Sequence, residues 1–284
     1  MKLDAATFLL QWATGGLLFG WVTTRRREVS LGYGWLIRIV FATFAAGAAA
    51  VFLTGDLTAG RVIAAVAALG CAATATIALV VSIQRRGAGV RGREEVRAAR
   101  RARVSAMIGR AGEENLDRGP EFPPVLDVIA PGFGAVGLLA AAQFAGGPYL
   151  LAVARLVVGA VFLGSVSDAM LLGHWYLVQP GLPREALKEL VVWTAIAWPF
   201  EVAVFLWPTG MVQVLDGVID DGYHGVLGWI WVACAAMTIG LVGLTWAALR
   251  ERYYSAVMAA TGLLYLAILT AFGTDLVARA VIRP

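Results

Sequence analysis

Apolar runs of about 20 residues recur along this 284-residue chain, and they restrict it to one class of fold. A transmembrane helix needs about 20 consecutive apolar residues to cross the hydrocarbon core of a bilayer. Hydrophobic residues make up 60% of the chain and charged residues only 15%, whereas a soluble domain carries about 25% charged residues. The runs are continuous rather than alternating, which argues against a membrane β-barrel. The sequence therefore predicts an all-α polytopic membrane protein.

We expect eight transmembrane helices with both termini outside. The spans cover residues 4–23, 35–54, 61–83, 125–145, 149–178, 187–208, 226–249 and 255–278. The basic cluster Arg25-Arg26-Arg27 follows the first run, whereas a cleaved signal peptide has its basic residues in front. Most Lys and Arg lie after spans one, three, five and seven, and positively charged loops face the cytoplasm. The pattern predicts a multi-pass protein of the cell inner (cytoplasmic) membrane.

The spans divide into two sets of four, which predicts an internal duplication. Short stretches recur in the same order: LLFGWV and LLGHWY, AVFLTG and AVFLWPTG, CAATATIALV and CAAMTIGLV, GLLAA and GLLYLA. A four-helix unit begins and ends on one side of the membrane, so two such units form a parallel repeat. We assign spans 1–3 of the first unit to 1–83, an Arg-rich cytoplasmic segment to 84–124, span 4 to 125–147 and the second unit to 148–284.

The segment 84–124 has ten Arg and six acidic residues. Residues 93–108 within it predict a surface helix with apolar side chains on one side. A basic amphipathic helix on the cytoplasmic side suits anionic lipid headgroups, and docking of a soluble partner is the alternative. Nucleic acid is not expected, because aromatic side chains are not interleaved with the basic ones. The candidate docking residues are Arg93, Arg97, Arg100, Arg101 and Arg103.

Span five, within 148–180, carries Arg155, Asp168 and His174. Ionisable side chains in hydrocarbon cost several kcal/mol unless they are paired or wetted, so they mark function by default. At 100° per residue the three side chains lie on different faces of the helix. A helix with polar groups on every side has no broad face for lipid, so we place span five inside the bundle.

The depths of the ionisable residues decide which of them can meet. Arg155 is expected in the outer half of the membrane, Asp168 somewhat to the inner side of the middle, and His174 near the inner headgroups. Glu201 on span six and Asp275 on span eight are expected in the outer half. An outer cluster of Arg155 with Asp275 or Glu201 fits these depths, either as a structural ion pair or as part of an ion or proton path.

Asp168 follows Ser165 and Ser167, whose hydroxyls could bond either to its carboxyl group or to a neighbouring backbone carbonyl. A carboxylic acid at that depth is expected to be neutral, and it could relay protons or bind a polar headgroup. Arg38 on span two is the candidate basic partner at a similar depth, although a side chain so near the inner face could also snorkel to the surface.

His174 precedes Trp175 and Tyr176, an arrangement that fits either a hydrogen bond to a quinone carbonyl or an interfacial aromatic belt. We do not expect haem, because the second histidine, His224, is predicted on the opposite side of the membrane. Met170 lies one turn away on the same helix and cannot complete an axial pair. We expect no metal site and no covalently bound cofactor, since Cys71 and Cys234 are isolated in apolar spans.

The outer segment between spans six and seven contains Asp216, Asp220 and Asp221, with His224 close by. Such a group could bind a cation or a partner, and a solvated acidic loop is the alternative.

No G-x-S-x-G, P-loop or H-E-x-x-H motif is present, so a non-catalytic subunit is expected rather than an enzyme. In span count and in the pairing of two four-helix sets, the chain resembles the NrfD type of quinol-interacting subunit. Our first hypothesis is a non-haem subunit of a respiratory or other redox complex that contacts quinone or conducts protons through span five. The second is a secondary transporter or channel with its site at the repeat interface, and the third is a structural or assembly protein.

Overall fold

The computed structural model describes residues 4–56, 58–88, 120–179, 182–208, 210–251 and 253–282. Within these ranges all regular structure is helical, and seven helices are long and apolar enough to cross a membrane. The predicted surface helix lies outside the described residues, as do its arginines, Arg93, Arg97, Arg100, Arg101 and Arg103. The apolar helices indicate a multi-pass membrane protein.

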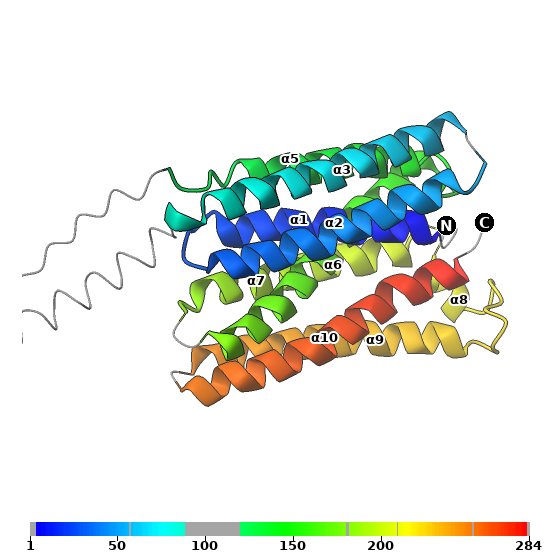
Figure 1. Cartoon of the computed structure of the whole chain (residues 1–284). Coiled ribbons are helices and arrows are strands. Elements are labelled where there is room, and N and C mark those ends of the chain that lie inside the picture. The colour runs from blue at the N-terminus through cyan, green and yellow to red at the C-terminus, as the bar shows by residue number, and fades with distance from the viewer. Residues whose placement is uncertain are drawn as a thin grey trace, which may run out of the picture.

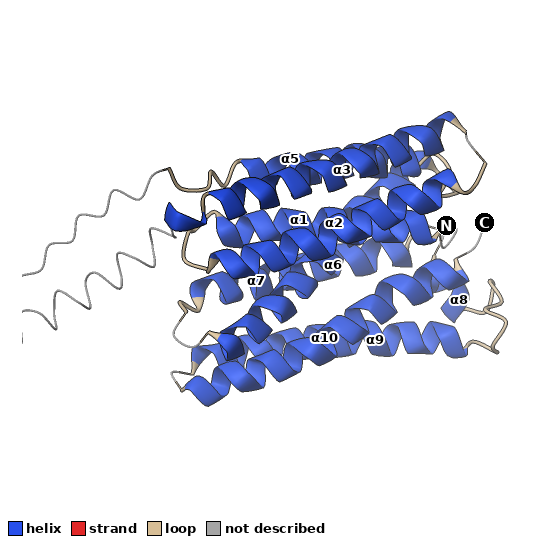
Figure 2. Ribbon diagram, viewed as in Figure 1, coloured by secondary structure: helices blue, strands red, loops and turns tan. Residues whose placement is uncertain are grey.

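Figure 2 shows the helices and the loops that join them. The first half contains α1 (Ala5–Thr24), α2 (Leu31–Leu53), α3 (Ala59–Gln84), the 3₁₀ turn η1 (Arg86–Ala88) and α5 (Leu126–Ala141). The second half contains α6 (Tyr149–Val178), α7 (Glu185–Leu206), the short α8 (Met211–Leu215), α9 (Val226–Arg250) and α10 (Tyr254–Val281). Every predicted span coincides with one helix, long in seven cases and short for α5, and the bounds of α6 are those predicted. Long apolar helices form here because only intrahelical hydrogen bonds can satisfy the backbone in lipid.

Helix α5 differs from the predicted span 125–145, because it has 16 residues and ends at Ala141. Gly146 and Gly147 follow with φ values of 84° and 80°, a backbone conformation that glycine adopts without strain and that ends the helical path. Sixteen residues rise about 24 Å, whereas a hydrocarbon core is about 30 Å thick. The helix is therefore shorter than the seven candidate spans, and an eighth crossing stays a prediction.

Each half of the chain forms a closed group of four helices. In the first half, α1 packs against α2, α2 against α3, α3 against α5, and α5 returns to α1. In the second half, α6, α7, α9 and α10 contact one another in the same cyclic order. Figure 1 shows α3 and α5 at the top, α9 and α10 at the bottom and α1 with α6 between them, and both termini lie at the same end of the bundle.

The two groups meet where α1 packs directly against α6. A Cβ atom added to Gly15 would lie 1.8 Å from the Ala160 carbonyl oxygen, and one added to Gly164 would lie 2.2 Å from the Gly15 carbonyl carbon. The two backbones are therefore in contact, which is the role of small residues in membrane helix packing. In their most apolar windows, 67% of the residues of α1 and 61% of those of α6 are buried, against 33–39% in the other candidate spans. The expected interior position of α6 is confirmed.

Large apolar side chains cover the outer surfaces of the bundle. Val66 on α3 is 62% exposed, Leu244 on α9 58% and Leu269 on α10 69%. Exposed large apolar side chains on so many long apolar helices match a lipid environment.

Candidate functional site

Asp168 lies on α6 in the interior of the bundle. The residue is fully buried, and neither carboxyl oxygen has a hydrogen-bond partner among the described residues. The Tyr33 hydroxyl donates to its backbone carbonyl oxygen at 3.4 Å rather than to its side chain. Burial of an ionised carboxylate without donors costs several kcal/mol, so this position favours the neutral acid.

The two serines beside Asp168 do not bond to its carboxyl group; of the two predicted alternatives, Ser165 adopts the bond to a neighbouring backbone carbonyl. The Ser165 hydroxyl donates to the Phe162 carbonyl, one turn back along its own helix, which is the usual bond of a serine inside a helix. It also accepts from the Thr194 hydroxyl at 3.0 Å. Ser167 accepts from the Trp12 indole nitrogen at 2.9 Å. Both hydroxyls therefore link α6 to neighbouring helices.

Arg38 was predicted as the partner of Asp168, and this was wrong. Its Nε and Nη2 atoms each donate to Asp127 at 2.7 Å, and both side chains are almost fully buried. Asp127 also accepts from the Thr24 hydroxyl at 3.0 Å, and the guanidinium lies 4.5 Å from the centre of the Phe122 ring. The two-point geometry is the strongest that an Arg–carboxylate pair adopts, so Arg38 is held away from Asp168.

A second buried polar group joins α10 to α1. Arg279 on α10 donates to both oxygens of Asp275, at 2.6 Å from Nε and 2.9 Å from Nη2. Gln11 on α1 donates to Asp275 at 3.3 Å and accepts from Arg279. All three side chains are fully or almost fully buried. This network connects α1 to α10 across the junction of the two four-helix groups.

Glu201 and Arg155 lie beside this network, so the residues of the predicted cluster share one region; the side of the membrane that it faces stays a prediction. Asp275, Arg279 and Arg155 are the charged groups that act on Glu201. Glu201 is fully buried, and its two oxygens have no hydrogen-bond partner in the described part of the chain. The Arg155 Nε atom donates to the Val204 carbonyl at 2.8 Å. Asp275 is thus paired with Arg279 rather than with Arg155.

Sequence reasoning missed Gln11, Asp127 and Arg279. Asp275 and Arg279 are four residues apart, so they share one face of a helix, and this spacing was a usable signal. Asp127 was predicted within a span at the inner side, where it could have been matched to Arg38. Gln11 carried no comparable signal, because a single amide in a span does not indicate its partner.

Comparison with protein-family models, with curated proteins and with solved structures found no match to this chain. The site is therefore interpreted from its own geometry. In the described part of the chain no group of three or more His, Cys, Asp or Glu side chains could hold a metal ion.

Polar groups form a discontinuous line between the two buried acids. Ser165 lies one turn from Asp168 on α6, and its partner Thr194 lies two turns from Glu201 on the same face of α7. Phe162 and Ala197 belong to the buried apolar cluster in this region. Hydroxyls and carboxyls can pass protons through hydrogen bonds with water, but the apolar section must admit water for the line to become continuous.

His174 is exposed and points away from these groups. Its Nδ1 atom lies 3.0 Å from the Tyr265 hydroxyl on α10, and Trp175 donates to Ser30 and Gln179. The structure therefore separates His174 from Asp168 and from the outer cluster, so the predicted site residues form three distinct places.

The acidic loop between α8 and α9 is organised around Asp221. Its carboxylate accepts backbone hydrogen bonds from Tyr223, Gly225 and Leu227, each at 2.8 Å. Desolvation opposes the effect, but together these donors lower the pKa of Asp221 below its ordinary value of 3.8. His224 and Gly225 have φ values of 55° and 82°, which the carboxylate helps to hold. Asp221 therefore has a structural role in this loop. Asp216 and Asp220 are exposed.

We expect Asp221→Asn to accelerate hydrogen–deuterium exchange in residues 221–228, because an amide replaces a charged acceptor of several N–H groups. A carboxylate whose pKa is lower in the folded loop than in the unfolded chain stabilises the loop fully at any pH above the unfolded-state pKa. This stabilisation is lost as the pH falls through the pKa of the folded state. The wild-type loop should therefore loosen below about pH 3.8. Asp216→Asn is the control, and equal exchange in both variants would contradict the role of Asp221.

Proposed function

We propose that this chain is a non-haem integral membrane subunit that transfers protons along α6 and α7 within a multi-protein redox complex of the cytoplasmic membrane. The observation that carries this proposal is the fully buried carboxyl group of Asp168, which has no hydrogen-bond partner among the described residues. A neutral acid in such a place can release a proton and take it back when water reaches it. Glu201 has the same properties in the outer half.

The proposal includes eight spans arranged as two parallel four-helix repeats with both termini outside. The equivalent cyclic packing of the two groups supports the duplication. At one end of the bundle lie several arginines that support a cytoplasmic assignment for that end. They are Arg25, Arg26, Arg27, Arg85, Arg86, Arg184 and Arg250.

Close packing at the repeat interface favours protons over a larger solute. Gly15 touches Ala160 and Gly164 through backbone atoms, so a transporter of the second class would have to separate α1 from α6 to open a site there. Proton transfer requires only transient water between the buried acids.

A quinone contact is a second candidate function, and one observation favours it. His174 and Tyr265 form a hydrogen-bonded pair of exposed side chains near the end of the bundle that we assign to the cytoplasm. A lipid-facing imidazole there could donate to a quinone carbonyl. The redox complex would then couple quinone chemistry at His174 to proton transfer through α6.

We expect Asp168→Asn to reduce proton flux by about 100-fold or more, because asparagine keeps the shape of the side chain but cannot carry a proton. The protein, purified in mild detergent with any bound subunits, is reconstituted into liposomes. A potassium diffusion potential drives protons, and an internal pH dye reports the flux. Asp216→Asn, which removes an exposed carboxylate, should retain wild-type flux.

Absence of proton flux in the wild type, or equal flux in Asp168→Asn, would contradict proton transfer. A chain that purifies alone and still moves protons would contradict the redox complex while leaving the role of Asp168 intact. Mass spectrometry of the mild-detergent preparation identifies the bound subunits.

A further inference from the structure

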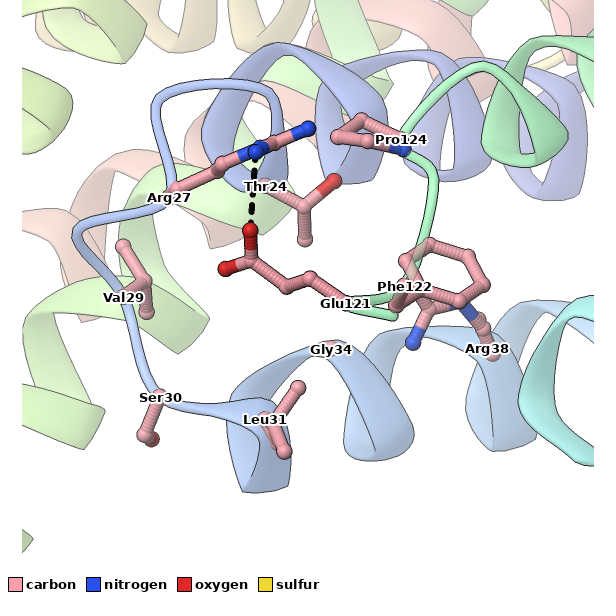
Figure 3. A pocket seen from close by; sticks show the side chains of 10 residues that line it. All are labelled: Thr24, Arg27, Val29, Ser30, Leu31, Gly34, Arg38, Glu121, Phe122 and Pro124. Carbon is pink, nitrogen blue, oxygen red and sulfur yellow. Dashed lines mark hydrogen bonds and ion pairs between the residues drawn. The ribbon is translucent and has the colours of Figure 1, made fainter. Parts of the chain in front are cut away.

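Two small cavities lie at the end of the bundle where α1 joins α2. The outermost, shown in Figure 3, is partly open to solvent and offers water about 30 Å³ between the loop after α1 and the segment before α5. The second offers water about 10 Å³ between α1, α2 and the start of α5. Thr24, Gly34 and Arg38 line both cavities. Since one water molecule needs about 10–15 Å³ of such space, the outer cavity can hold about two water molecules and the deeper one at most one.

The Arg38–Asp127 ion pair lies at the junction of the cavities. Figure 3 shows Arg38 beside Phe122 at one side of the outer cavity, with the ion pair of Arg27 and Glu121 at the other. Arg38 lines both spaces, and Asp127 lines only the deeper one. The buried pair therefore separates water at the bundle end from the interior.

The deeper cavity ends close to Asp168. Gly20 lines this cavity, and a Cβ atom added to Gly20 would lie 3.9 Å from the Asp168 Oδ2 atom and 2.5 Å from Ile37 Cγ2. Asp168 itself lines neither cavity, and Gly20 and Ile37 lie between its carboxyl group and the deeper one. The hydroxyl of Tyr33 on α2 donates to the backbone carbonyl oxygen of Asp168.

We propose that these cavities form the route by which protons from the cytoplasmic end reach Asp168. Separation of the Arg38–Asp127 pair opens this route, and the side-chain-free position of Gly20 is its narrow point (the window) beside Asp168. This inference rests on the proposed function and adds the direction of access. Water enters the outer cavity and passes the ion pair when the pair separates. A hydronium ion in the deeper cavity then transfers its proton to the Asp168 carboxylate and leaves a water molecule, and the reverse step returns the proton. Arg38 and Asp127 are positioning residues that control water and charge along the route.

The test measures proton flux in proteoliposomes while the pH varies on one side only. Cleavage within the Arg-rich segment 84–124 by added trypsin reports how the protein is oriented. In the wild type, flux should depend on the pH at the end that carries this segment. The double variant Arg38→Gln with Asp127→Asn removes both charges, which avoids leaving one buried charge unpaired. We expect it to change the flux by about tenfold or more and to abolish the response to pH on that side.

Gly20→Ala tests the same route with the ion pair intact, so the test does not depend on the double variant folding. The added methyl group narrows the window beside Asp168, and flux should fall by about tenfold. Glu189→Gln is the matched control, because Glu189 pairs with Arg25 and Arg26 at the same end but lines neither cavity. It should behave as the wild type.

Wild-type flux with an unchanged pH response in both the double variant and Gly20→Ala would overturn the proposed route. Flux that depends on Asp168 but responds only to pH on the other side would also overturn it, and would leave the proposed function standing. Absence of flux in the wild type would instead refute the proposed function.

Discussion

Gly164→Ala is expected to destabilise the folded protein by about 3 kcal/mol or more, because overpacking at a rigid contact is costly. The new Cβ atom would lie 2.2 Å from the carbonyl carbon of Gly15 and 2.5 Å from its Cα atom. These are backbone atoms of α1, so no side-chain rotation can relieve the clash. The two four-helix groups would have to move apart along their shared contact. Thermal unfolding in detergent, followed by size-exclusion chromatography, measures the loss.

Gly243→Ala is the matched control for this substitution. Gly243 lies inside α9, and an added Cβ atom meets nothing within 4 Å. Alanine is favoured over glycine in a helix by about 1 kcal/mol, so this variant should be as stable as the wild type or more stable. Equal stability of Gly164→Ala and Gly243→Ala would show that α1 and α6 are not in backbone contact.

Arg279→Met is expected to cost about 3–5 kcal/mol of the free energy of unfolding, because it leaves the buried Asp275 without its cationic partner. Removing both charges, in Asp275→Leu with Arg279→Met, should recover most of this loss, since a buried ion pair is often replaceable by apolar residues. The loss is large because both side chains are almost fully inaccessible. Unfolding by denaturant in detergent micelles, applied to the two single variants and the double variant, gives the coupling free energy.

Arg25→Gln provides the comparison at the surface. Its partner Glu189 also pairs with Arg26, and exposed ion pairs contribute about 0–1 kcal/mol. A cost for Arg279→Met as small as that for Arg25→Gln would contradict a desolvated network between α1 and α10. Additive effects of Asp275→Leu and Arg279→Met would contradict their pairing.

The helices could be predicted from the sequence because membrane spans are determined by length and apolarity, which are local properties. The bounds of α6 were predicted to the residue, and its interior position followed from polar groups on every side. Helix α5 was the exception at its end, because three of the four residues after Ala141 are apolar and the sequence therefore did not mark the end of the helix. The turn that begins there depends on the backbone of Gly146 and Gly147.

The partners of the buried polar side chains could not be predicted in the same way. The predicted depths placed Glu201, Arg155 and Asp275 in one region, where the structure also has them. Depth does not determine in which direction around its helix a side chain points. Arg38 and Asp127 are 89 residues apart, and Gln11 and Asp275 are 264 apart. Such pairs depend on how whole helices pack.

The same reason explains the isolation of Asp168. Its sequence neighbours Ser165 and Ser167 suggested hydrogen bonds, but a helix directs successive side chains to different faces. The serines bond to α7 and α1, and the carboxyl group turns toward Gly20. The carboxyl group of Asp168 is therefore isolated in the folded protein, although its neighbours in the sequence are polar.

The most direct test of the account is the infrared spectrum of reconstituted protein at neutral pH, compared between wild type and Asp168→Asn. We expect the wild type to show the carbonyl stretch of a protonated carboxylic acid that the variant lacks, and we expect this band to shift after exchange into deuterium oxide. Glu201→Gln should leave that band in place. Identical carboxylic-acid bands in wild type and Asp168→Asn would mean that Asp168 is ionised, and a band that does not shift would mean that water never reaches it; either result would contradict proton transfer at this residue.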